Sequence, residues 1–205
     1  MKAFGKVFAT EFGVCEGFDR LKFAGRTDFS LIREFFSFHS IPPTPENFAR
    51  FFDRYAFWLD HILSQSHTEV CPGVWRFIHA LQQLPQPPVM GLLTGNIRLG
   101  AEIKLRHFGL WEVFKTGGFA DDHEDRDQIA AVARARGHRL AGSNLGDDEV
   151  LVVGDTPLDI QCARAIHARV LAVATGGVTL DELESHSPDW VVPDLRQAPS
   201  EIFGA

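Results

Sequence analysis

From about residue 70 onward, short apolar runs alternate with stretches whose apolar residues have helical spacing. Strands are predicted at 87–93, 118–120, 150–153, 169–174 and within 188–195, and helices at 74–81, 97–108, 128–136 and 158–166, with a polar connection at 137–148. Such alternation is typical of a parallel α/β sheet with helices on its faces. We therefore expect a Rossmann-like parallel core over residues 69–205.

The first 68 residues contain no convincing strand. Apolar residues from Phe48 to Leu63 form one helical stripe, and Thr44 is placed to cap that helix. Aromatic residues at this spacing more often form the core of a helical lobe than line a ligand site. We expect residues 1–68 to form a helical cap region, with the first helix of the core, residues 1–12, at its start.

Composition narrows the class of protein. The formal net charge of -7 argues against a nucleic-acid partner, because such proteins usually carry a basic face. No apolar run approaches the roughly 20 residues of a membrane helix, and the N-terminus lacks the apolar stretch of a signal peptide. Cys15, Cys71 and Cys162 lie far apart without metal-binding spacing, so a cytoplasmic location is the default expectation. Oligomeric state is left open.

The segment LVVGDTPLDI, residues 151–160, carries the strongest chemical signal. An apolar strand leads directly into Asp155, and Asp159 follows on the first turn of a helix begun by Pro157. In an open parallel sheet, ligands bind beyond the carboxyl ends of the strands. Two carboxylates there suit Mg²⁺, which keeps several waters and is completed by substrate phosphate. The alternative is helix capping by Asp155 or Thr156; we favour the metal site.

The segment GLLTGN, residues 91–96, predicts a second polar strand end. The Thr94 hydroxyl and the backbone N–H groups of Gly95 and Asn96 would lie at a strand tip and at the start of a helix. Such a turn can bind an anion. The motif alone is weak because turns use these residues for backbone reasons. Together with the strand that precedes Asp155, it predicts a phosphate site.

The order of these motifs resembles the phosphoglycolate-phosphatase-like branch of the haloacid dehalogenase superfamily. Thr94-Gly95-Asn96 is followed by A-x-x-K-L-x-x-F-G-L at 101–110, a basic residue and V-G-D-T-P-x-D at 153–159, while GRTD at 25–28 resembles the start of the helical cap. The resemblance implies that Thr94 binds phosphate and Asp155 binds Mg²⁺. Asp159 would be a further ligand or would orient the water on the metal.

The resemblance also implies a cation that neutralises the phosphoryl group. Arg126, within DDHEDRD, falls at the corresponding place, although the family usually has lysine there. Lys104 is the rival, but its helical pattern explains it as a solvated residue. Arg26 either reaches a substrate anion from the cap or pairs with Asp28.

One family motif is missing from the 205 residues. Members begin with a strand ending in Asp-x-Asp-Gly-Thr, whose first Asp attacks phosphorus and whose second is the general acid/base. Asp19 is the only aspartate before Arg26, and the one Asp-x-Asp, at 125–127, follows no apolar strand. The resemblance places the missing first central strand within about 20 residues upstream of Met1.

We therefore expect the strands ending at Leu93 and Val153 to be unpaired, with each unsatisfied buried backbone group costing about 1–3 kcal/mol. The chain alone should be weakly stable or recruit something that fills the gap. The leading functional prediction is a Mg²⁺-dependent hydrolase of small phosphate monoesters by ancestry, inactive in this form. The alternative is a non-catalytic protein that keeps a phosphate and metal site.

Overall fold

Helices and short strands alternate through the computed structural model, which describes residues 1–142 and 146–203. The helices are α1 (Lys2–Phe12), α2 (Asp28–Phe38), α3 (Pro45–Ser64), α4 (Val74–Gln82), α5 (Arg98–His107), α6 (Arg126–Ala141), α7 (Pro157–Ala165) and α8 (Leu180–Ser185). The strands are β1 (Gly91–Leu93), β2 (Thr116–Gly118), β3 (Leu151–Gly154), β4 (Arg169–Val173) and β5 (Trp190–Val192). Every strand pair is parallel, which confirms the predicted α/β class.

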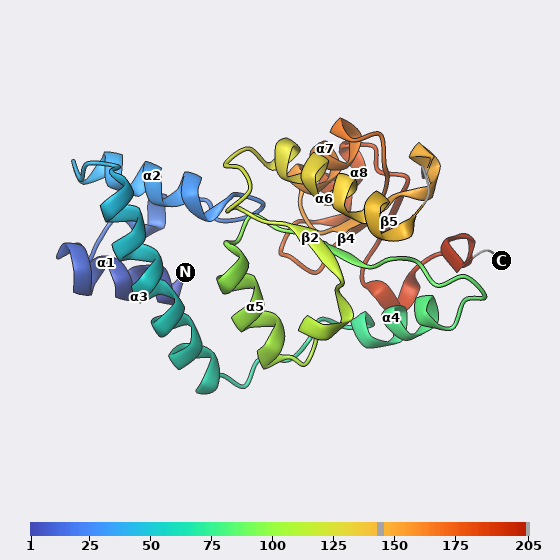
Figure 1. Ribbon diagram of the computed structural model, residues 1–205, viewed down its shortest axis with the longest axis horizontal. Helices are drawn as coiled ribbons and strands as arrows, with labels where there is room; N and C mark the ends of the chain where they lie inside the picture. The colour runs from blue at the N-terminus through green and yellow to red at the C-terminus, as the bar shows by residue number, and fades with distance from the viewer. Residues whose placement is uncertain (143–145, 204–205) are drawn as a thin grey trace.

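Helices α1, α2 and α3 enclose a core made largely of phenylalanine. Phe8 from α1 and Phe35 from α2 are fully buried, with ring centroids 4.1 Å apart. The ring centroids of Phe51 from α3 and Phe8 are 4.9 Å apart. Figure 1 shows these helices on the opposite side of the molecule from β4 and β5. The aromatic stripe is therefore a packed core, as predicted; the division of the chain at residue 68 stays a prediction.

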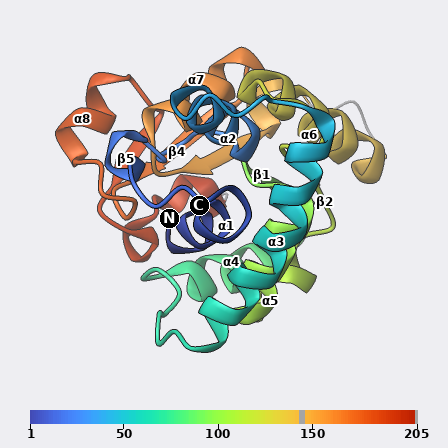
Figure 2. The same cartoon turned by 90° about the vertical axis from the view of Figure 1, so that its left-hand side faces the viewer.

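The strands form two separate sheets rather than one. β1 pairs only with β2, while β3, β4 and β5 form the second sheet in that order. In Figure 2, β1 and β2 lie on one side of the view and β4 and β5 on the other. The strands ending at Leu93 and Val153 are thus each paired on one side, with β2 and β4 respectively, and not with each other.

A layer of two helices connects the two sheets. α6 packs on β1 and β2, α7 packs on β3 and β4, and the two helices pack against each other. Leu93 of β1 lies against an apolar cluster that contains Ala130 of α6 and Val152 of β3. Side-chain packing on this face replaces the backbone ladder that the sheets lack.

Several element boundaries differ from the prediction. α6 begins at Arg126 because Asp125 caps it, and it continues through Gly137 to Ala141, since arginine and alanine favour helix and one glycine costs only about 1 kcal/mol. The polar connection predicted at 137–148 is therefore partly helical, and its residues 143–145 lie outside the described part. The strand predicted at 87–93 is confined to 91–93, because Pro87 and Pro88 cannot donate to a ladder. The one predicted at 118–120 lies at 116–118.

The Thr44 hydroxyl accepts a bond from the N–H of Asn47 (3.3 Å), so it caps α3 as predicted. Within residues 1–142 and 146–203, no helix is both long enough and apolar enough to cross a bilayer.

The phenylalanine core gives a stability prediction. Phe35→Ala removes a fully buried ring between α1 and α2 and should lower the free energy of unfolding by about 3–5 kcal/mol in urea denaturation. Phe38→Ala is the matched control on the same helix, because its side chain is 48% exposed, and should change that free energy by less than about 0.5 kcal/mol. Equal losses in the two variants would contradict the assigned packing.

Candidate functional site

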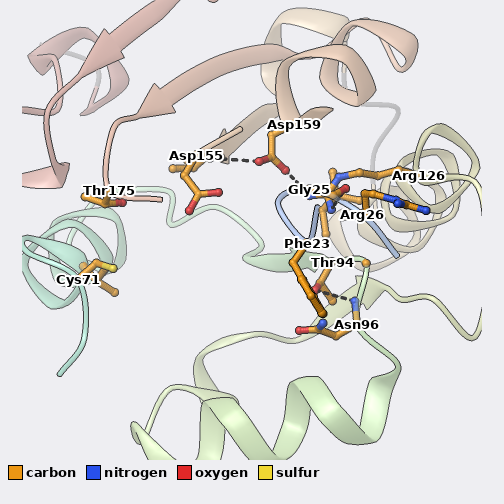
Figure 3. Close-up of a pocket in the computed structure, with 15 residues that line it drawn as sticks. Phe23, Gly25, Arg26, Cys71, Thr94, Asn96, Arg126, Asp155, Asp159 and Thr175 are labelled. Atoms are coloured by element: carbon orange, nitrogen blue, oxygen red, sulfur yellow. Dashed lines mark hydrogen bonds and ion pairs between the residues drawn. The ribbon is translucent and has the colours of Figure 1, made fainter. Parts of the chain in front are cut away.

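The predicted polar strand ends border one cavity of about 450 Å³. Thr94 follows β1 and Asp155 follows β3, so the tips of both sheets contribute to it. In Figure 3, Asp155 and Asp159 lie at the top of the view, Thr94 and Asn96 lie below them, and Arg126 lies to one side. All seven residues predicted for the site line this cavity: Arg26, Thr94, Gly95, Asn96, Arg126, Asp155 and Asp159.

Asp159 is held by the start of α7. Its Oδ2 accepts hydrogen bonds from the N–H of Asp155 (3.1 Å), the N–H of Thr156 (3.0 Å) and the hydroxyl of Thr156 (2.7 Å). The Thr156 hydroxyl in turn accepts from the N–H of Asp159 (3.3 Å), which completes a capping box. Capping, the alternative to metal binding, therefore accounts for Thr156 and for one oxygen of Asp159, but not for the carboxylate of Asp155.

Asp155 is half-buried and borders the cavity. Burial raises the pKa of its carboxyl, and the negative charge of Asp159 raises this pKa further, against smaller opposing effects from its own backbone and from Arg126. A carboxylate in such surroundings is stabilised by a nearby cation. Asp155 could therefore hold a cation in this cavity.

Arg126 is the first residue of α6 and extends into the cavity from the opposite side. Its guanidinium donates to the Gly25 carbonyl (3.1 Å) and forms an ion pair with Oδ1 of Asp159. Its Nε is buried and has no hydrogen-bond partner among the residues that the structure describes. An unsatisfied buried donor of this kind is costly.

Several polar groups of the turn after β1 already have hydrogen-bond partners within the protein, which the sequence did not indicate. The Thr94 hydroxyl accepts from the N–H of Asn96 (3.1 Å), so this N–H is not free to bind an anion. The Asn96 side chain donates to Asp28 (3.2 Å) and accepts from Lys104 Nζ (2.8 Å). Asn96 therefore links Asp28 of α2 to Lys104 of α5, in addition to bordering the cavity.

Asp28 is the main residue that sequence reasoning missed. It is 2% exposed, and its second oxygen accepts from the N–H of Ile97 (2.8 Å). Burial raises the pKa of its carboxyl, although Lys104 and the bonds from Ile97 and Asn96 oppose the rise. Lys104 is half-buried, and burial lowers the pKa of its ammonium group. The interpretation of Lys104 as a solvated residue was wrong because α5 turns it toward Asn96.

The segment 25–28 contacts both strand tips. Gly95 passes so close to it that a Cβ there would lie 2.4 Å from the Arg26 carbonyl oxygen. Gly25 has a left-handed backbone (φ 70°), and a Cβ there would lie 2.8 Å from the Thr156 hydroxyl oxygen. Only glycine fits either position without a shift.

Arg26 forms an ion pair with Glu34, not with Asp28 as one interpretation had it, because Asp28 turns inward toward Asn96. It lines the cavity and is partly exposed, so it remains a candidate for contact with a ligand.

The carboxylates at the cavity could bind a divalent cation, but they would supply few protein ligands to it. The described residues contain no group of three or more His, Cys, Asp or Glu side chains that could enclose a metal. The carboxylates at the cavity are Asp155 and Asp159, and both oxygens of Asp159 already have partners. Mg²⁺ tolerates such a site because it commonly keeps several waters and uses one or two carboxylates.

Comparisons with known proteins concern part of the sequence and the fold. Residues 127–198, which include β3, the Asp155 turn and α7, match the family model described as HAD-hydrolase-like. No curated protein matches the chain.

Solved structures with the same fold cover nearly the whole chain. CbbY from Rhodobacter sphaeroides, solved in complex with phosphate, matches with a TM-score of 0.76 at 14% identity over 96% of this chain and 87% of that one. A β-phosphoglucomutase from Clostridium difficile gives 0.73 at 14% identity, with 99% and 86% coverage. A predicted phosphoglycolate phosphatase from Haemophilus somnus gives 0.69 at 16% identity, with 95% and 86% coverage.

The chain therefore has the fold of the haloacid dehalogenase-like hydrolases, and its C-terminal third carries their sequence pattern. The predicted resemblance to haloacid dehalogenase-like hydrolases is thus confirmed in the fold and, over residues 127–198, in the sequence.

The buried Asp28 gives a pH prediction. Because its pKa is raised in the folded chain, folding takes up a proton between the ordinary pKa near 3.8 and the higher folded value. The stability that this group contributes is present at low pH and is lost as pH rises through the folded pKa. The Asp28→Asn variant lacks this loss.

Urea titrations from about pH 4 to pH 7 should thus show the wild-type chain losing stability relative to Asp28→Asn as pH rises. Asp60→Asn, at an exposed position on α3, controls for the removal of one carboxyl group. A difference between wild type and Asp28→Asn that does not change with pH would contradict the prediction.

Proposed function

We propose that the cavity binds a small phosphate monoester together with Mg²⁺, and that this chain is by descent a phosphoric monoester hydrolase of the phosphoglycolate-phosphatase-like kind. Asp155 would be the protein ligand of the metal, and Asp159 would orient Arg126 and the water on the metal. Thr94 and the backbone of Gly95 and Asn96 would face the phosphate. Mg²⁺, when bound, would neutralise phosphoryl charge as a Lewis acid.

The proposal rests on two charged groups that border the same cavity. The guanidinium of Arg126 and the Asp155 carboxylate, whose pKa is raised, border the same 450 Å³ cavity. Arg126 could donate to an anion in this cavity, and Asp155 could bind a cation. A phosphate group with a bound divalent cation supplies both.

Structures of similar fold support the substrate class. CbbY was solved in complex with phosphate, and another similar chain is a predicted phosphoglycolate phosphatase. Arg26 borders the cavity from the cap and is suited to a second anionic group, such as a substrate carboxylate.

We further propose that the 205 residues do not catalyse hydrolysis by themselves. Phosphoryl transfer through an aspartyl-phosphate needs a nucleophile and a neighbouring general acid. Both carboxylates at the cavity have other tasks, since Asp155 is the metal ligand and Asp159 holds Arg126 and α7. The rival function, a phosphate-binding protein without catalysis, shares the same binding residues.

Asp155 gives a prediction that separates a metal ligand from a structural residue. Asp155→Asn removes the repulsion from Asp159 and should leave the free energy of unfolding unchanged or raise it by about 0.5–2 kcal/mol. In wild type, Mg²⁺ should raise the melting temperature, and this rise should disappear in the variant. Asp53→Asn, an exposed control on α3, should keep the rise. A Mg²⁺ response retained by Asp155→Asn would overturn the assigned role.

Phosphate binding and phosphate-ester hydrolysis can be tested in separate experiments. The purified 205-residue chain should bind inorganic phosphate in the presence of Mg²⁺ in calorimetry, and Arg126→Ala should weaken this binding by about tenfold or more. The same chain should release no p-nitrophenol from p-nitrophenyl phosphate above the background. Robust Mg²⁺-dependent hydrolysis would refute the proposed inactivity, and the absence of phosphate binding would refute the proposed site.

A further inference from the structure

Asp28 binds the turn after β1 along three consecutive residues. Its backbone N–H donates to the Gly95 carbonyl (2.7 Å). One oxygen of its side chain accepts from the Asn96 amide (3.2 Å), and the other accepts from the N–H of Ile97 (2.8 Å). The first residue of α2 therefore fixes the position of residues 95–97 relative to the helical part of the chain.

Lys104 of α5 holds the same asparagine from the other side of its amide group. The Lys104 Nζ donates to Asn96 Oδ1 (2.8 Å), while Asn96 Nδ2 donates to Asp28. A cation at the amide oxygen and a carboxylate at the amide nitrogen permit only one orientation of this side chain. The Asn96 carbonyl also accepts from the N–H of Ala120 (2.9 Å), so the side chain and the backbone of Asn96 are both held.

The charges of Asp28 and Lys104 depend on each other. Asp28 is 2% exposed and both of its oxygens accept hydrogen bonds, which suits the ionised carboxylate. A buried carboxylate is costly without a counter-charge, and Lys104 opposes the rise in its pKa. Asp28 in turn opposes the fall in the pKa of Lys104. Arg26 and Arg33, the nearest arginines along the chain, pair with glutamates instead.

This arrangement acts on the cavity through Asn96. The turn of residues 94–96 lines the cavity, whereas Asp28 and Lys104 do not. The N–H of Asn96 donates to the Thr94 hydroxyl (3.1 Å), the contact drawn between these two residues in Figure 3. A rotation of Asn96 would therefore displace the Thr94 hydroxyl that borders the cavity.

We propose that Lys104 and Asp28 are positioning residues of the phosphate site, a charge pair that fixes the Asn96 amide between them and thereby sets the place of the Thr94 hydroxyl. Lys104 thus acts through Asn96 and does not itself touch the phosphoryl group. The effect on phosphate rests on the function proposed above, whereas the effect on the turn can be measured without any ligand.

Lys104→Met removes the ammonium group and keeps an unbranched side chain. The Asp28 carboxylate then loses its counter-charge, so it takes up a proton and one of its oxygens becomes a donor. We expect inorganic phosphate, in the presence of Mg²⁺, to bind about fivefold more weakly in calorimetry. Hydrogen exchange at the amide of Ile97 should be about tenfold faster.

A second variant tests whether the two residues act as a pair. Asp28→Asn alone keeps the shape of the side chain but not its charge, and should weaken phosphate binding by about threefold and speed exchange at Ile97. Added to Lys104→Met, it should cause little further loss, because the buried charge is already gone. Losses that multiply in the double variant would contradict the pair. Wild-type values in Asp28→Asn would reject the proposal even if Lys104→Met failed to fold.

Arg106→Met is the matched control, because it removes a cation from the same helix at a side chain that is 55% exposed. It should change phosphate affinity by less than about twofold and leave exchange at Ile97 as in wild type. The rise in melting temperature with Mg²⁺, assigned to Asp155, should persist in Lys104→Met. Loss of that rise as well would indicate general damage and contradict a role confined to the turn.

Further outcomes separate the charge pair from the proposed function. If wild type binds phosphate and Lys104→Met binds it equally well, the positioning role is wrong. If wild type binds no phosphate, the proposed function fails and the positioning role fails with it; exchange at Ile97 then shows whether the charge pair still holds the turn. Unchanged exchange in Lys104→Met overturns the pair in either case.

Discussion

The contact of residues 25–28 with both strand tips is the constraint on which the rest of the site depends. The two sheets share no backbone ladder, so their relative position is set by the packing of α6 on α7 and by this segment. Gly95 lies against the Arg26 carbonyl on one side, and Gly25 lies against Thr156 on the other. Arg126 adds a hydrogen bond to the Gly25 carbonyl. The distance between the turn after β1 and Asp155 is therefore governed by a few close contacts of glycine with backbone and side-chain atoms.

The same contacts explain why so many polar groups of the site serve the protein itself. Asp28 is buried, and burying a carboxyl without partners would cost several kcal/mol, so Asn96, Ile97 and Lys104 surround it. Asn96 consequently has little freedom to contact a ligand through its side chain. Arg126 divides its donors in the same way between Gly25 and Asp159.

Much of the core and the location of the site could be predicted from sequence because they depend on local patterns. The strand leading into Asp155, the cap at Thr44 and the aromatic stripe each involve neighbouring residues or one helix period. Asp28 and Lys104 were misjudged because their partner Asn96 is far from Asp28 along the chain, and a single helical pattern does not show which neighbour a lysine meets. The boundaries of α6 were missed because Asp125 caps it earlier than expected and one glycine is too weak a signal to end it.

The phenylalanine core also bears on the order in which the chain folds. Its helices α1, α2 and α3 are consecutive, so their contacts close short loops, whereas β1 and β3 are separated by several elements and are not paired with each other. Contacts between nearby segments form with less loss of chain entropy. We expect the helical core to form first and the two sheets to consolidate later, so refolding monitored at Trp58 of the helical core should precede refolding at Trp190 of β5. Simultaneous changes at both positions would show instead that the halves fold as a single cooperative unit.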